Sequence, residues 1–245
     1  ERGYGPGGGG LQGGGSHGGL GGEGCGSLAY GSAENPLAPG SGGGGYYSDA
    51  VYNACGMPGG GLVWIEARDR ITLFGSILAD GVAAGNYPGS GSGGAVSLMC
   101  RTLAGSPGGL VRANGGNRGW TTRGGGGGGR IAVRYQGADQ AAVGSTGIRF
   151  SAAGADNGAD LADMGTLYFT DDALLATELA WSGSVVIPGF TTWTPDSLTL
   201  KDGWLGFRAP GFHLDVAGDL LVSGAAARLH LGGGAVRETV GGTDR

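Results

Sequence analysis

Short stretches in which apolar and polar residues alternate recur along the middle of the chain. Three of them, Leu62–Arg68, Ala95–Arg101 and Gly128–Arg134, follow one another at a spacing of 33 residues, and Gly165–Phe169 is a shorter fourth copy. Alternation over about five to seven residues is the period of a half-buried β-strand. Each copy therefore predicts one strand, and the constant spacing predicts that the strands belong to repeated units.

Equivalent positions of the copies are apolar, which predicts ladders of stacked side chains. The inward-facing sets are Val63 with Val96, and Ile65 with Leu98, Ile131 and Leu167. Shorter apolar stretches ending in glycine corners follow the first two copies, at Ile77–Gly81 and Val111–Gly115. Three short strands per repeat predict an all-β fold, a right-handed parallel β-helix with glycine-rich loop insertions. A β-sandwich with packed polyglycine II segments is the alternative.

The chain divides into three regions. Residues 1–60 are dominated by glycine, residues 61–170 hold the 33-residue repeat, and residues 171–245 hold shorter strand-like stretches between single glycines. In the last region, Asp171–Ala180 has the pattern of a short helix that begins at its own acidic residues. The other stretches there, such as Arg228–Leu231, predict coils without long insertions.

Composition sharpens this picture. Glycine accounts for 62 of the 245 residues, yet 40% of the chain is hydrophobic, enough for a core. Ordering so much glycine costs backbone entropy, so dense hydrogen bonding between closely packed segments must offset it. The net charge of −5 argues against a nucleic-acid partner, because such proteins carry basic patches. No apolar run approaches the length of a transmembrane helix, so no membrane span is expected.

The succession GGGLVWIEA, SILADG, SGSGGAVSLMCRTLAG, LVRANGG and GGGGGGRIAV resembles the glycine-rich repeat regions of large secreted bacterial surface proteins. Those adhesin-like regions are taken to be β-helical. The resemblance covers about residues 1–170 and implies an extracellular or cell-surface location and a structural or adhesive task, with no catalytic residues to transfer. The glycine runs more loosely resemble the polyglycine bundles of phage tail-tip adhesins, in which glycine strands pack as threefold helices.

One dense cluster of oxygen-bearing side chains is present. It comprises Asp156, Asn157, Asp160 and Asp163. Calcium takes about six to eight oxygen ligands, so this cluster is a candidate calcium site. The spacing lacks the glycine and the closing glutamate of an EF-hand, and Asn-Gly is also a plain turn signal. Both interpretations stay open.

The three cysteines fall in different surroundings. Cys100 is on the inward side of its strand and is expected to be a buried thiol. Cys25 and Cys55 lie in glycine-rich stretches and are candidates for a disulfide if the chain is secreted, with separate free thiols as the alternative.

Aromatic residues in or beside the glycine-rich loops are candidate ligand-binding positions. They are Tyr46, Tyr47, Tyr87 and Trp120. Exposed rings on rigid loops suit sugar stacking and protein interfaces, whereas the alternative is that these rings lie flat on glycine backbone.

Charged residues give no pattern typical of an enzyme. Arg68, Arg101 and Arg134 share the 33-residue spacing and predict a stacked arginine ladder that braces the coils. Histidines and carboxylates show no triad or paired-acid spacing, so no enzyme is expected. The sequence favours an extracellular structural or adhesive segment of a surface or filament assembly, whose partners are copies of itself or adjacent domains of a longer chain. A carbohydrate-binding module, with surface glycans as partners, and a polysaccharide-degrading β-helix enzyme are the alternatives.

Overall fold

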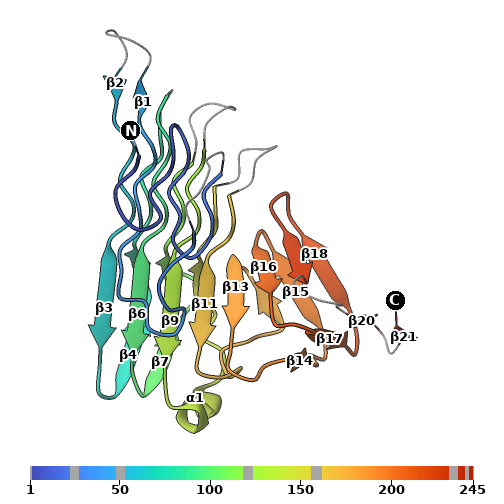
Figure 1. The fold of residues 1–245 in the computed structure, drawn as a ribbon. Helices are drawn as coiled ribbons and strands as arrows, with labels where there is room; N and C mark the ends of the chain where they lie inside the picture. The colour runs from blue at the N-terminus through green and yellow to red at the C-terminus, as the bar shows by residue number, and fades with distance from the viewer. Residues whose placement is uncertain are drawn as a thin grey trace.

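The chain is built almost entirely from strands and extended segments, with a single short helix among the described residues. The computed structural model describes residues 2–22, 28–47, 53–85, 87–117, 124–155, 162–231, 237–240 and 243–244. The strands stand side by side, and the long loops of the first half extend beyond one end of them (Figure 1). The predicted all-β class is confirmed at this level.

The largest sheet has seven strands, each parallel to its neighbours. In spatial order they are β3 (Leu62–Glu66), β6 (Ala95–Met99), β9 (Arg130–Arg134), β11 (Thr166–Phe169), β13 (Gly183–Val186), β16 (Trp204–Phe207) and β19 (Arg228–Leu231). Spatial order follows chain order, so the chain leaves this sheet after each strand and returns beside it. This parallel pairing does not fit the alternative of an antiparallel sandwich built from hairpins.

Smaller sheets hold the strands between these returns. They are β5 (Ser76–Leu78), β8 (Leu110–Arg112) and β10 (Arg149–Ser151); β4 (Arg70–Leu73) and β7 (Thr102–Gly105); β12 (Glu178–Leu179), β15 (Leu198–Lys201) and β18 (Leu220–Ser223); and β14 (Thr192–Trp193), β17 (His213–Val216), β20 (Arg237–Val240) and β21 (Thr243–Asp244). β1 (Tyr46–Tyr47) and β2 (Asn53–Ala54) form a separate antiparallel pair. Only this pair and β20–β21 are antiparallel among the described strands.

The first ladder is one residue pair out of the predicted register. Ile65 lies beside Leu98 as expected, but Leu98 lies beside Val133, and Ile131 lies beside Val96. From β6 to β9 the repeat is therefore 35 residues (Ala95 to Arg130), not 33. The predicted ladder of Ile65, Leu98 and Ile131 is wrong at its third member. An offset of two residues keeps every side chain on the same face of the sheet, so alternation could not reveal it.

The arginine ladder fails for the same reason. Arg134 lies beside Met99 and not beside Arg101. Its guanidinium sits over the indole of Trp64, 5.5 Å from the ring centroid, and donates to Ser97 Oγ at 3.1 Å. Arg101 instead pairs with Asp139 at 2.7 Å. The two guanidinium groups thus have different partners.

The core runs as continuous rows of side chains through the seven-stranded sheet. One row contains Leu98, Val133 and Phe169, and all three are fully buried. Further along, Phe150, Phe169 and Trp181 pack ring to ring, with centroids 5.0 to 5.2 Å apart. The indole nitrogen of Trp181 donates to the carbonyl of Ile148 at 2.9 Å, so this ring is buried without losing its hydrogen bond.

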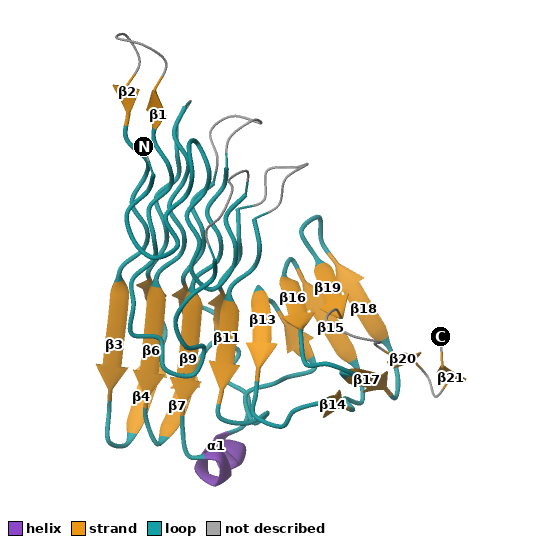
Figure 2. Cartoon of the chain, in the orientation of Figure 1, coloured by secondary structure: helices purple, strands orange, loops and turns teal. Residues whose placement is uncertain are grey.

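The helix is not where the sequence predicted it. Residues 171–177 form turns, and β12 follows, because Asp171 Oδ1 accepts the backbone N–H of Ala173 in a tight local turn. The helix α1 (Gly137–Val143) lies after β9, at the end of the strands away from the glycine-rich loops (Figure 2). No helix in the described ranges is long and apolar enough to span a membrane.

Helix α1 ends the sheet formed by β4 and β7. Its buried Gln140 accepts the backbone N–H of Leu103 in β7 at 2.7 Å through Oε1, and donates to the carbonyl of Leu103 at 3.1 Å through Nε2. These are the two bonds that a neighbouring strand would have made. A side-chain amide therefore closes this strand edge.

Candidate functional site: the open rung and the glycine layer

Extended glycine-rich segments form a second layer that continues beyond the strands. We call this the glycine layer; it comprises residues 3–22, 40–45, 56–61, 79–84, 89–94, 113–117, 124–129, 152–155 and 162–165. Segments from both sides of residue 60 alternate within it. Residues 12–22, for example, exchange backbone hydrogen bonds with residues 124–128.

Hydrogen bonds of the run Gly124–Gly129 repeat every third residue. The N–H groups of Gly124 and Gly127 donate to Gln12 and Gly15, those of Gly126 and Gly129 donate to Gly116 and Ala113, and the carbonyls of Gly124 and Gly127 accept from Ser90 and Gly93. A period of three is that of an extended polyproline II-type helix, whose backbone groups point outward in three directions. The expectation that this run packs against other backbone is confirmed.

The contacts of the glycine layer leave no room for side chains. A Cβ added at Gly14 would overlap the carbonyl oxygen of Gly125, and one added at Gly127 would overlap that of Gly19. By contrast, a Cβ at Gly75, in the turn between β4 and β5, would meet nothing within 4 Å. Glycine is therefore required by close approach in the layer, and only permitted at Gly75.

His17 is the one histidine of the glycine layer, and it is fully buried. Its Nδ1 lies 3.0 Å from the carbonyl oxygen of Gly93 and 3.1 Å from that of Gly94, so Nδ1 carries the proton. Its ring packs against that of Tyr30, with centroids 4.7 Å apart. Burial lowers the pKa of His17 to about 4, and the positive charge of Arg130 acts in the same direction.

Arg130 fixes the segment around Tyr30 onto the first position of β9. It is only 7% exposed; its Nε donates to the carbonyl of Tyr30 at 2.9 Å and its Nη1 donates to Thr166 Oγ1 at 3.1 Å. Burial lowers the pKa of Arg130. Glycine surroundings gave no sequence signal for this cluster, since neither His17 nor Tyr30 belongs to any repeat.

The candidate calcium ligands are mostly outside the described residues. Asp156, Asn157 and Asp160 lie there, and Asp163 belongs to the glycine layer. The backbone of Asp163 donates to Leu20 and accepts from Gly128. Within the described ranges, no group of three His, Cys, Asp or Glu side chains could hold a metal ion.

The cysteines and loop aromatics are placed only in part. Cys100 is buried as expected, and burial raises its pKa. Cys55 is exposed and free, while Cys25 lies outside the described residues, so the predicted bridge stays a prediction. Tyr46 and Tyr87 come together and stack, with centroids 5.2 Å apart at an interplanar angle of 15°.

Two of the candidate aromatic positions remain unassessed. Trp120 and the side chain of Tyr47 lie outside what the structure describes. No family model, no curated protein and no solved structure matches this chain. The site must therefore be argued from its own geometry.

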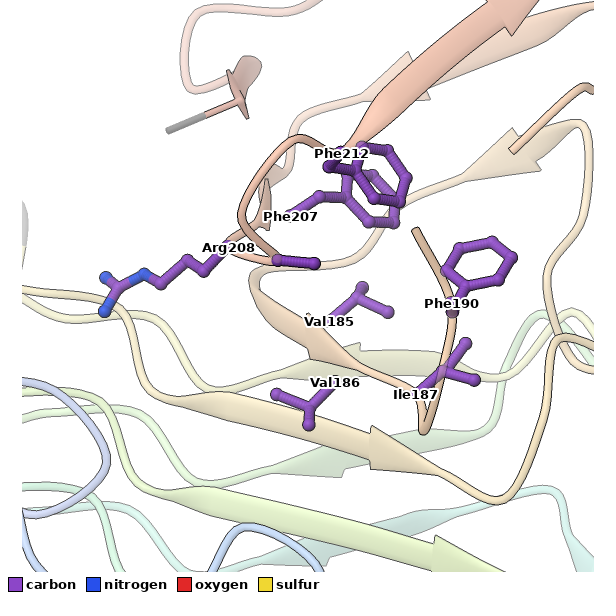
Figure 3. A pocket seen from close by; sticks show the side chains of 8 residues that line it. Val185, Val186, Ile187, Phe190, Phe207, Arg208 and Phe212 are labelled. Carbon is purple, nitrogen blue, oxygen red and sulfur yellow. The ribbon is translucent and has the colours of Figure 1, made fainter. Parts of the chain in front are cut away.

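An apolar cavity of about 260 Å³ lies at the corner after β13 and β16 (Figure 3). Its walls include Val185, Ile187, Phe190 and the stacked rings of Phe207 and Phe212, whose centroids are 4.4 Å apart. Arg208, at its edge, points away from the rings (Figure 3). With no charged group of the labelled side chains directed inward, this cavity has the character of a packing gap in the core.

The first three strands of the stack, β3, β4 and β5, form what we call the first rung, and β6, β7 and β8 form the second. Each strand of the first rung pairs on one side only within the described structure. Its inward residues Ile65, Ile71 and Ile77 are half-buried, whereas their partners Leu98, Leu103 and Val111 in the second rung are fully buried. The apolar core is therefore open at this end.

Large apolar side chains gather on the outer surface of the same end. Trp64 is 44% exposed, Phe74 68% and Leu78 50%. In the glycine layer and its loops, Tyr4 and Leu28 are among the most exposed apolar residues of the described chain. Monomeric proteins rarely expose contiguous apolar patches of this kind, so the first rung is the strongest candidate for an interaction site.

Proposed function

We propose that the chain is a right-handed parallel β-helix that serves as an extracellular structural or adhesive segment of a surface or filament assembly. Right-handed crossovers are the rule for parallel strands that return to the same sheet. The resemblance of its glycine-rich repeats to those of secreted bacterial surface proteins supports the location and the task. In this proposal the chain works by self-association and not by catalysis.

The observation that carries the proposal is the open first rung. Three adjacent strand edges with unused N–H and C=O groups, beside a half-buried apolar core, form a template for further strands. Burial of apolar surface contributes roughly 25 cal/mol per Å², so covering Trp64, Phe74 and Leu78 would favour association by several kcal/mol before its entropic cost.

The rigid character of the rest of the chain fits a structural task. Side-chain rows run through the seven-stranded sheet, and backbone hydrogen bonds cross-link the glycine layer. The net charge of −5 over 245 residues gives little electrostatic resistance to association of identical chains.

Sedimentation velocity over a wide range of protein concentration tests the proposal. We expect the average sedimentation coefficient to rise with concentration as copies associate. A chain that stays monomeric up to millimolar concentration would refute self-association as the mode of action.

Carbohydrate binding is a second candidate, favoured by the stacked pair Tyr46 and Tyr87 beside the glycine layer. Each ring uses one face on the other, which leaves one face of each for a sugar. A glycan array separates the two candidates, because reproducible binding that is lost in Tyr87→Ala would favour a carbohydrate-binding module.

A further inference from the structure

The two ends of the stack differ in how well they are closed. At the C-terminal end, β21 pairs antiparallel with β20, with Val240 beside Thr243, and so occupies the outer edge of one sheet. At the N-terminal end, each strand of the first rung has a neighbour on one side only in the described structure. An added rung therefore meets a free edge in every sheet at one end, and an occupied edge at the other.

The outlines of the two ends also differ. Near the N-terminal end the chain takes 33 residues to return to the main sheet (Leu62 to Ala95), and near the C-terminal end it takes 24 (Trp204 to Arg228). Docking the last coil of one copy on the first rung of another would match unequal outlines. The first rung matches itself by symmetry, because an interface around a twofold axis uses the same patch on both chains.

Strand β3 has none of the devices that protect natural strand edges. It contains no proline or lysine, and its five residues, LVWIE, alternate in exposure without a bulge. Its outward side chains are Leu62, Trp64 and Glu66, and its inward ones are Val63 and Ile65. The strand is symmetric about Trp64, with one outward residue on each side of it.

Charges beside this strand are balanced. Glu66, Arg68, Asp69 and Arg70 follow one another at the end of β3 and the start of β4, two acidic and two basic. Asp69 is largely exposed, and its carboxylate lies 3.7 Å from the guanidinium of Arg101. A face with equal numbers of both signs is not repelled by a copy of itself.

We propose that the first rung binds the first rung of a second copy, with the two β3 strands antiparallel about a twofold axis through Trp64. The two seven-stranded sheets then form one continuous sheet, with Val63 opposite Ile65 of the second copy and the two Trp64 residues opposite each other. This inference rests on the proposed self-association and names its partner and its geometry. The product is a closed pair and not an open filament.

Disulfide trapping tests the axis. Side chains directly opposite in antiparallel strands have Cβ atoms about 4.5 to 5.5 Å apart, near the separation that a disulfide requires. In a background with Cys25→Ser and Cys55→Ser, we expect Trp64→Cys to give a disulfide-linked dimer under mild oxidation. Leu78→Cys, equally exposed on β5 but away from the axis, is the matched control and stays monomeric on a denaturing gel.

A charge substitution tests the same geometry without chemistry. Trp64→Lys places two ammonium groups opposite each other, and we expect the dimer dissociation constant to rise at least about tenfold. Leu221→Lys makes the same kind of change on β18 at the other end, where Leu221 is 50% exposed, and should leave the constant unchanged. Circular dichroism confirms that both variants are folded.

The outcomes separate this inference from the proposed function. Association that persists in Trp64→Lys but is lost in Leu221→Lys, or a cross-link between Trp64→Cys and Leu221→Cys, would mean head-to-tail docking and would overturn the twofold pair. Association with no Trp64→Cys cross-link overturns it as well and leaves self-association standing. A chain that is monomeric at every concentration overturns both.

Discussion

The strand stack and the glycine layer are held together by opposite means. In the stack, rows such as Leu98, Val133 and Phe169 fill the interior with side chains, and the backbone pairs only along the sheet. In the layer, side chains are excluded, and the backbone pairs in several directions. The first design encodes its fold in which apolar residue stands where, whereas the second encodes it in the absence of Cβ atoms. The two should therefore respond differently to the same kinds of substitution.

The largest effect is expected in the stack. Leu98→Asp places a carboxylate at a fully buried position between Ile65 and Val133, and a lone buried charge costs several kcal/mol or more. We expect loss of folding, measured by circular dichroism. Leu62→Asp, on an exposed outward position of the neighbouring strand, is the control; a folded Leu98→Asp chain would contradict the core described above.

In the glycine layer, adding one methyl group should suffice to destabilise. Gly127→Ala directs its Cβ at the carbonyl oxygen of Gly19, and backbone cannot yield as a side chain would. We expect a loss of about 3 kcal/mol in the free energy of unfolding, at the upper end of overpacking effects. Gly75→Ala, which meets open space, should change it by less than about 1 kcal/mol. Equal effects in urea titrations would mean that the layer is not close-packed.

Acid should weaken the layer and spare the stack. The pKa of His17 is lowered from 6.5 to about 4, so between these values the unfolded chain binds a proton that the folded chain does not. Stability is therefore full above pH 6.5 and is lost as the pH falls toward 4, by about 2 kcal/mol at pH 5.

The control for this pH dependence is His17→Gln. Its amide N–H can donate to the carbonyl of Gly93 but does not titrate. The difference in unfolding free energy between pH 7 and pH 5 should shrink by about 2 kcal/mol in this variant, on the basis of the same pKa shift. An unchanged difference would assign the acid sensitivity to other groups.

Sequence reasoning reached the strands better than their neighbours. The alternation in Leu62–Glu66 and Ala95–Met99 predicted both strands, their inward faces and their register. The register of β9 was missed because a shift by two residues preserves the alternation. Helix α1 was missed because it is short, begins at a glycine and lacks a side-chain cap, so neither periodicity nor capping indicated it.

Prediction in the glycine layer reached its principle but not its contacts. Close backbone packing followed from composition, since ordered glycine needs many hydrogen bonds. Which run lies beside which does not follow, because identical residues carry no address: nothing in Gly124–Gly129 distinguishes residues 12–22 from any other run as a neighbour. Likewise, the open first rung emerged only when the exposure of Ile65 was compared with that of Leu98.

The threefold repeat of hydrogen bonds in Gly124–Gly129 sets a rule for insertions and deletions. Removing or adding one residue turns every later N–H and C=O group toward a different neighbouring segment, whereas a change of three residues restores each direction after one full turn. Length variation in such runs should therefore survive in steps of three. The glycine layer thus has a reading frame of its own, written in backbone directions and indifferent to side-chain identity.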